Sequence, residues 1–173
     1  MLGYLFVCAA AGFAIGILNF RFKLSLFTAE MFLMIFPQMM LSVPVFQIVA
    51  KLQLLDTYIG VILVWIAYFT PYGTYIMATY FASVPRSLYE SAKIDGANIF
   101  QILFRVMIPI AKPMMITIGI LGFQGMWSEL PFSLLILRSV GKRTLTLGVA
   151  MMRGQYGLPT VVQSAAIVVT AVL

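Results

Sequence analysis

The chain has 173 residues, 62% of them hydrophobic and 9% charged, with a formal net charge of +6, whereas soluble domains are about a quarter charged. It has no histidine, one cysteine and five acidic residues, which excludes a Cys/His zinc site, a Cys-His dyad and an internal disulfide, and no metal site is expected. The eleven basic residues are scattered between apolar stretches, so they indicate membrane orientation and interface anchoring rather than nucleic-acid binding.

The apolar stretches predict an all-α fold, a polytopic transmembrane helical bundle, because a spanning helix needs roughly 20 apolar residues. A single transmembrane domain is expected to fill the chain, with spans at residues 2–20, 31–50, 58–82, 107–126 and 157–173. The first span carries Gly12 and Gly16, whose GxxxG spacing permits close approach of another helix. Ordinary glycine use in a membrane helix explains this pair equally well.

Proline and aromatic residues mark the second and third spans. Pro37 and Pro44 are expected to kink the second span, because proline frees the carbonyl of an earlier turn. Gln38 lies in the same segment, which suggests that the segment faces protein or a cavity more than lipid. In the third span, Trp65 and Tyr72 belong to an aromatic series that favours packing and interface anchoring over stacking on a substrate.

Residues 83–112 differ in character from the spans on either side. They carry six charges, at Arg86, Glu90, Lys93, Asp95, Arg105 and Lys112. Ser83 followed by Pro85 is a helix-start signal, a hydroxyl cap with proline in the first turn. We therefore expect a short helix from Pro85 to about Ile94.

A turn and a second short helix are expected after this one. Asp95-Gly96 predicts the turn, because glycine readily adopts the positive φ that ends a helix. The second helix is expected from Ala97 to about Val106, ending near Pro109. On physical grounds alone, the resulting bent pair is either a solvated loop or a docking element.

The last third of the chain mixes apolar and basic stretches. The span at 107–126 is expected to start near Met107, with Lys112 reaching sideways to the headgroups and a glycine face formed by Gly119, Gly122 and Gly125. Residues 130–137 are too few to span and suggest a re-entrant or interfacial segment. The chain stops inside an apolar run, so we expect a bundle truncated at both ends.

The polar segment resembles the cytoplasmic EAA loop of ATP-binding-cassette importer permeases, whose pattern is E-A-A, three residues, G, nine residues, then I-x-L-P. The matching residues are Glu90-Ser91-Ala92, Gly96, Val106, Ile108 and Pro109, with mild departures at 91, 106 and 108. Asp95-Gly96-Ala97 also matches the Asp-Gly-Ala frequent in that family. The chain is therefore similar to permease subunits of binding-protein-dependent importers, which have the MetI-like type I fold.

The resemblance implies a role, partners and a location. The segment would be a coupling element in a cleft of a nucleotide-binding ATPase subunit, through Glu90, Ser91, Ala92, Asp95, Gly96, Ala97, Val106, Ile108 and Pro109. The chain would lie in the cell (inner or plasma) membrane among lipid, with residues 83–112 in the cytosol. A second permease subunit and an extracytoplasmic solute-binding protein would complete the importer. The chain itself would need no cofactor and catalyse nothing, since the ATPase subunits hydrolyse ATP.

Three further stretches resemble motifs of carbohydrate-type permeases and imply a sugar as the solute. They are Leu54-Leu55-Asp56-Thr57-Tyr58, Trp127-Ser128-Glu129-Leu130 and Thr144-Leu145-Thr146-Leu147-Gly148. An importer permease for a non-sugar solute is the alternative. A membrane-embedded enzyme fits less well because the acids are dispersed, and a channel fits less well because nothing resembles a selectivity filter.

Two sets of residues are candidates for further contacts. The candidates for the substrate path are Gln38, Tyr72, Gln124 and Trp127. The resemblance also points to a loop that faces the binding protein, with candidates Arg138, Lys142, Arg143 and Tyr156, although a solvated loop explains these residues equally well. Compared with the usual six-span subunit, the chain is expected to lack the first span and the end of the last.

Overall fold

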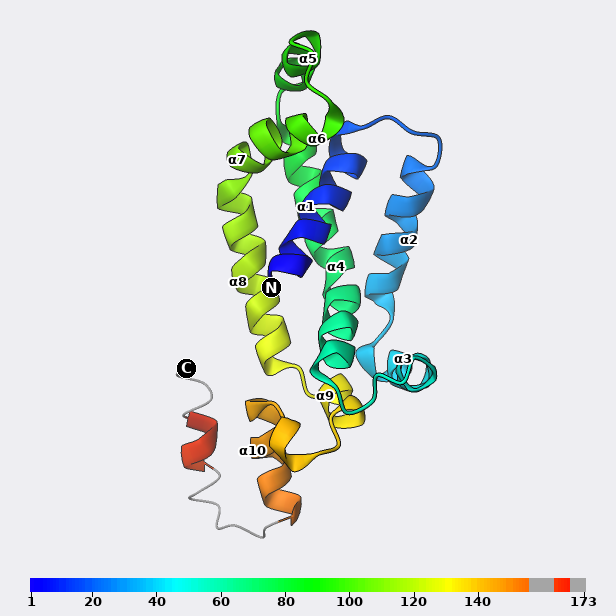
Figure 1. The fold of residues 1–173 in the computed structure, drawn as a ribbon, viewed down its shortest axis with the longest axis vertical. Coiled ribbons are helices and arrows are strands. Elements are labelled where there is room, and N and C mark those ends of the chain that lie inside the picture. Colours follow the sequence, from blue (N-terminus) through cyan, green and yellow to red (C-terminus); the bar gives the residue numbers. More distant parts are fainter. Residues whose placement is uncertain (156–163, 169–173) are drawn as a thin grey trace. The chain divides into compact units, whose positions relative to one another are not determined.

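The computed structural model describes residues 1–155 and 164–168, which form helices with no strand among them (Figure 1). The expected all-α fold is therefore confirmed. The chain divides into two compact units, one formed by Met1–Phe36 and Ile66–Gly125, the other by Pro37–Trp65 and the described part of Met126–Leu173. The chain passes between the units three times, after Phe36, Trp65 and Gly125.

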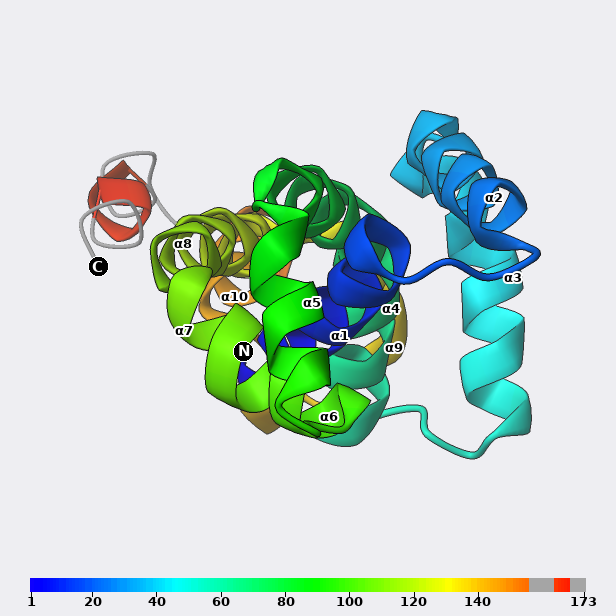
Figure 2. The ribbon, with the colours of Figure 1, turned by 90° about the horizontal axis from the view of Figure 1, so that it is seen from above.

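The first unit is built around α1. Its helices are α1 (Leu2–Ile17), α2 (Lys23–Ile35), residues 66–83 of α4 (Tyr58–Ser83), α5 (Arg86–Ile94), α6 (Ile99–Ile102), α7 (Ile108–Ile110) and residues 112–125 of α8 (Lys112–Ser128). Side chains of α1 are buried along much of its length, whereas none of α2 is buried. In both ribbon views α2 lies on the side of α4 away from α8, and the Phe27 ring of α2 stacks on the Tyr75 ring of α4 with a centroid distance of 5.9 Å (Figures 1 and 2).

Glycines let α1 approach α4 closely. A Cβ added to Gly12 would lie 2.4 Å from the Cβ of Met77, and one added to Gly16 would lie 2.8 Å from the carbonyl oxygen of Ala78. Real Cβ atoms do not come so near to other atoms, so the GxxxG pair of α1 serves helix packing, and its partner helix is α4.

Tyr4 fills the space between α1 and two glycines on neighbouring helices. Its side chain is 1% exposed. A Cβ on Gly73 would lie 2.6 Å from the Tyr4 hydroxyl oxygen, and one on Gly122 would lie 2.4 Å from Cε1 of the Tyr4 ring. At Gly119, one turn earlier on α8, a Cβ would meet only Leu5, at 3.7 Å. The absence of a side chain at Gly122 is therefore required for the packing of Tyr4, whereas Gly119 has room for a Cβ.

The second unit is built from shorter helices. These are α3 (Gln38–Lys51), residues 58–65 of α4, α9 (Pro131–Ile136), a 3-10 turn at Val140–Lys142, and α10 (Leu145–Gln155). Helix α3 packs against α9. Threonine caps begin two of the helices, with Thr57 Oγ1 accepting from the Gly60 N–H at 3.1 Å and Thr144 Oγ1 from the Leu147 N–H at 3.2 Å.

Asp56 ties the loop after α3 to the turn after α9, within the second unit. Its Oδ1 accepts from the backbone N–H groups of Arg138 at 3.0 Å and Ser139 at 2.9 Å, and its Oδ2 accepts from the Ser139 hydroxyl. Lys142 Nζ forms a salt bridge with Oδ2 at 3.1 Å. The Asp56 N–H donates to the Ile136 carbonyl at 2.8 Å. The loop after α3 is thus held in place by both the carboxylate and the backbone N–H of Asp56.

The observed helices differ from the expected course of the chain in two of the spans. Residues 31–50 do not form one kinked helix, because α2 ends at Ile35 and α3 begins at Gln38, with Phe36 and Pro37 extended between them. The residue before a proline disfavours helical geometry, so the chain breaks here instead of kinking. Pro44, by contrast, lies inside α3.

The second difference concerns residues 107–126. The helical stretch Ile99–Ile110 meets α8 at a bend of 79°, so α8 begins at Lys112 rather than near Met107. Among the described residues, one helix is long and apolar enough to cross a membrane, or up to three if each broken helix pair counts as one span. The expected span at 157–173 lies largely outside the described residues.

Alanine substitutions at two glycines of α8 should have different effects on stability. We expect Gly122→Ala to lower the free energy of unfolding by about 1–3 kcal/mol, because the new methyl group would overlap the Tyr4 ring. The matched Gly119→Ala has room and should be neutral or gain up to about 1 kcal/mol from reduced chain entropy. Thermal unfolding of the purified protein in detergent measures both, and equal effects would contradict this packing.

The Asp56 contacts predict a defined pH dependence. Hydrogen bonds from the Ser139 hydroxyl and N–H, with Lys142, hold the pKa of Asp56 well below its usual range. The resulting stabilisation is therefore complete above the ordinary aspartate pKa of about 4 and is lost as the pH falls through the lowered pKa. Asp56→Asn should lower the melting temperature at neutral pH, by an amount that stays constant down to about pH 4 and then shrinks.

Asparagine is the suitable replacement because Asp56 has a φ of 56°, a conformation that asparagine also tolerates. The control is Asp95→Asn, at an exposed helix end, which should leave stability within about 0.5 kcal/mol. Equal losses in the two variants would contradict the role given to Asp56.

Candidate functional site

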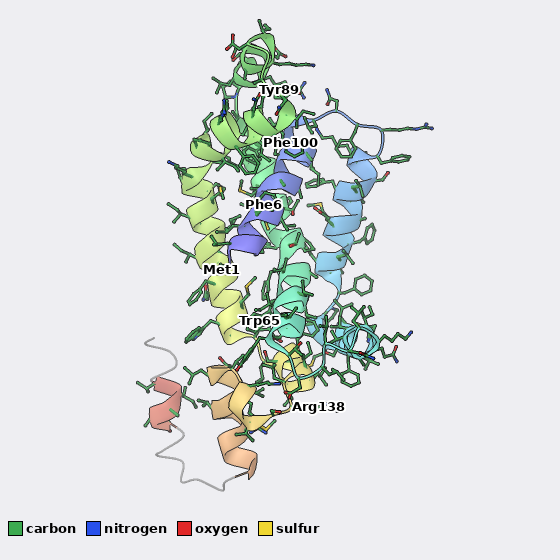
Figure 3. The ribbon with its side chains drawn as sticks, viewed as in Figure 1. Met1, Phe6, Trp65, Tyr89, Phe100 and Arg138 are labelled. Carbon is green, nitrogen blue, oxygen red and sulfur yellow. The ribbon has the colours of Figure 1, made fainter. Side chains whose placement is uncertain are left out.

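Helix α5 lies at one end of the first unit, beyond α6 and α7 (Figure 1). None of its residues is buried. Tyr89 anchors the helix, with its ring centroid 6.5 Å from that of Phe13 on α1 (Figure 3). The expected helix from about Pro85 to Ile94 is observed, with Pro85 as its N-cap.

Gly96 ends α5 in the way that its motif predicts. Its φ is +80°, and its N–H donates to the Lys93 carbonyl at 3.1 Å. The Ala97 N–H donates to the Ala92 carbonyl at 3.1 Å. These two bonds form a Schellman motif, which satisfies carbonyls left free at the helix end. A Cβ on Gly96 would meet nothing within 4 Å, so this position requires glycine for its backbone angle rather than for space.

The second arm starts two residues later than expected. Asn98 is the N-cap of α6: its side chain accepts from the Gln101 N–H at 2.9 Å, and the Gln101 side chain accepts from the Asn98 N–H at 2.8 Å. This capping box fixes the helix start at Ile99. Ala97 instead belongs to the end of α5, because its N–H completes the Schellman motif.

A tight corner joins the second arm to α8. Leu103–Met107 form a π-helical turn just before Pro109, and this wider turn makes room for the proline ring. The chain bends after Ile110, whose carbonyl accepts from the Tyr80 hydroxyl of α4 at 3.0 Å. Val106, Ile108 and Pro109 therefore shape the corner, while Glu90 and Ala92 lie on the projecting arm.

The projecting arms expose both charged and large apolar side chains. Arg86, Glu90 and Lys93 are exposed, and no salt bridge involves them within the described chain. Ile94 is 85% exposed and Phe100 is 72% exposed. An exposed mixed surface on a rigid, bent helix pair is suited to docking on another protein.

The chain matches, over residues 9–173, the family described as binding-protein-dependent transport system inner membrane component. It belongs to this family. The resemblance inferred from Glu90 to Pro109 is therefore confirmed at the level of the family.

Proteins similar to this chain include permeases whose names state the solute. It is 32% identical to the sulfoquinovosyl glycerol transport system permease protein SmoH of Agrobacterium fabrum, over 94% of this chain and 57% of that protein. It is 31% identical to the arabinooligosaccharides transport system permease protein AraQ of Bacillus subtilis, over 88% and 54%. The chain thus spans little more than half the length of the relatives that it matches.

A solved structure resembles the fold of this transport component. It is a bacterial ABC transporter involved in import of the acidic polysaccharide alginate, with a TM-score of 0.68 and 26% identity. The match covers 98% of this chain and 61% of the other. The type I importer permease fold expected from the sequence is confirmed.

The four substrate-path candidates are divided between the units. Tyr72 and Gln124 belong to the first unit, Gln38 and Trp127 to the second. The Gln38 side-chain amide donates to Glu129 at 2.7 Å, and the Trp127 carbonyl accepts from the Thr146 hydroxyl. Tyr72 is 44% exposed. A role for any of the four in solute transport stays a prediction.

Some residues that shape the site went unnoticed in the sequence. Tyr80 resembles the other aromatics of α4, and nothing local marks it as the partner of the Ile110 carbonyl. Asn98 and Gln101, in contrast, have the spacing of a capping box and were recognisable. Among the candidates for contact with a binding protein, Lys142 forms a salt bridge with Asp56, the Arg138 guanidinium lies 5.5 Å from the centroid of the Phe46 ring, and Tyr156 lies outside the described residues.

The backbone angle of Gly96 predicts which replacements preserve the bent pair. Gly96→Val should disrupt the turn conformation, because a β-branched residue is strongly disfavoured at φ +80°. Gly96→Asn should keep it, since asparagine tolerates this region and no atom lies near the new side chain. Limited tryptic cleavage at Arg86 and Lys93 measures the effect: the valine variant should be cut faster, and equal rates in both variants would contradict the requirement.

Proposed function

We propose that the chain is a permease subunit of an ATP-binding-cassette importer for a sugar, and that the bent pair α5–α6 docks it onto the nucleotide-binding ATPase subunit. The observation that carries this proposal is the rigid construction of an exposed element. Gly96 and Asn98 fix the angle between the arms, and the arms expose charged and apolar side chains. The match to the EAA pattern supplies the class of partner.

The contacts of the pair allow it to act as a lever. Tyr89 joins α5 to α1 through Phe13, and Tyr80 joins the corner at Ile110 to α4. A displacement of the pair by the ATPase would therefore move α1, α4 and α8 rather than dissipate in a loose loop. This matches alternating access by movement of packed helices around a solute path. The chain would take no part in ATP hydrolysis itself.

Sugar transport is supported by the named solutes of similar proteins. The proteins similar to this chain are named as permeases for sulfoquinovosyl glycerol, arabinooligosaccharides and, at 32% identity in Mycobacterium tuberculosis, trehalose. All three solutes contain sugar units, as does the alginate of the similar structure. A non-sugar solute is the alternative, and uptake assays with labelled mono- and oligosaccharides distinguish the two.

The same relationship supports the remaining partners. We infer a second permease subunit, an extracytoplasmic solute-binding protein, and a position in the cell membrane with residues 83–112 in the cytosol. The basic residues Arg138 and Arg143 lie in the connection from α9 to α10, and this connection would then face the binding protein.

Cross-linking tests the docking proposal directly. A cysteine at Glu90 should form a cross-link with the nucleotide-binding subunit in membranes containing the assembled importer, because Glu90 is exposed on the projecting arm. The native Cys8 is buried and does not compete. Leu52→Cys, equally accessible in the loop after α3, is the control and should give no such product. Failure at positions 90, 91 and 93 alike would overturn the docking role.

A further inference from the structure

Glu129 is a buried carboxylate that collects donors from three parts of the second unit. Its side chain is 4% exposed. Oε1 accepts from the Gln38 amide at 2.7 Å and from the Phe132 N–H at 2.6 Å. Oε2 accepts from the Trp65 indole N–H at 2.9 Å, and from the Ser133 hydroxyl at 2.8 Å and N–H at 3.1 Å. Each donor is a neutral group.

This arrangement satisfies a charge that would otherwise be costly to bury. An isolated ionised carboxylate in apolar surroundings is strongly disfavoured, whereas one that accepts several hydrogen bonds is not. The hydrogen bonds are distributed over the start of α3, the first part of α4 and the first turn of α9. Glu129 therefore holds together three segments that are distant in sequence.

The donors coincide with the places where the chain enters and leaves the second unit. Gln38 follows the passage at Phe36–Pro37 by one residue, Trp65 is the last residue before the passage into the first unit, and Glu129 follows the return at Gly125–Met126. Each of the three connections thus has a residue next to it that either donates a hydrogen bond to the Glu129 carboxylate or is Glu129 itself. All of these residues belong to the second unit.

We propose that Glu129 is a positioning residue for transport, which fixes the three connections to one point so that the second unit responds to the coupling segment as a single body. This proposal rests on the proposed function, since the lever α5–α6 belongs to the first unit. With Glu129 in place, a displacement of the first unit reaches α3, α4 and α9 together. Without it, α3, α4 and α9 would move independently of one another.

Glu129→Gln tests the role with little change in size. Glutamine keeps one acceptor oxygen but replaces the other with an NH2 donor, which would face the Trp65 N–H or the Phe132 N–H. The matched control is Glu30→Gln, the same change on α2 of the first unit. A second variant, Trp65→Phe, removes one donor and leaves the carboxylate in place.

The experiment measures distances between spin labels in the assembled importer in lipid vesicles. Labels at Met40 of α3 and Leu134 of α9 are both exposed and report on the second unit. A second pair, Ile94 and Leu134, reports whether magnesium ATP trapped with vanadate moves the coupling segment relative to α9. Leu2 and Ile120, in the first unit, are the control pair.

We expect a narrow distribution of distances between the labels at Met40 and Leu134 in the wild type and in Glu30→Gln. Glu129→Gln should broaden it, lose the nucleotide-dependent shift of the Ile94–Leu134 pair, and leave the Leu2–Ile120 pair unchanged. Trp65→Phe should broaden the Met40–Leu134 distribution less. Partial recovery in Glu129→Asp, which retains the charge, would support a positioning role over a merely structural one.

Several outcomes decide against the proposal. A Met40–Leu134 distribution and a nucleotide shift like those of the wild type in Glu129→Gln would overturn it. If that variant does not assemble, an unchanged distribution in Trp65→Phe overturns it instead. A wild type without any nucleotide shift would contradict the proposed function, while the Met40–Leu134 pair would still decide whether Glu129 holds the second unit together.

Discussion

Helix ends govern this structure, because a broken helix leaves N–H and carbonyl groups without partners and an apolar environment cannot supply them. The chain is broken into many short helices, and side chains satisfy most of the breaks described above. Thr57, Asn98, Glu129 and Thr144 accept from backbone N–H groups at helix starts, Asp56 accepts just beyond α9, and Tyr80 donates to the carbonyl of Ile110. These side chains therefore fix the helix ends that they bond.

Four of the five carboxylates fall into two groups, of which only the first meets this requirement. Asp56 and Glu129 bind backbone N–H groups of the second unit, whereas Glu90 and Asp95 lie exposed on the projecting segment of the first. A carboxylate that binds several N–H groups can fix a helix end at membrane depth, and one that is exposed can face a partner protein. The same residue type thus serves internal order in the second unit and lies exposed in the first.

The sequence predicted the bent helix pair α5–α6 well because local rules determine it. The turn at Gly96 follows from glycine's access to positive φ, and the first arm of the pair follows from Pro85. Local rules could not predict the break at Phe36, because an apolar run with an internal proline looks the same whether it kinks or ends. They could not place Glu129 either, since its donors Gln38 and Trp65 are brought to it only by the tertiary fold.

The residues of the motifs that indicated a sugar transporter make structural contacts within the chain. Thr57 and Thr144 cap helices, Asp56 fixes a loop, and Glu129 joins three segments. The contacts of these residues therefore account for local structure in the second unit. A buried polar group that loses its partner costs about 1–3 kcal/mol, so a solute competing for the Gln38 amide would first have to displace Glu129. The exposed Tyr72 has no such cost and is the better candidate for solute contact.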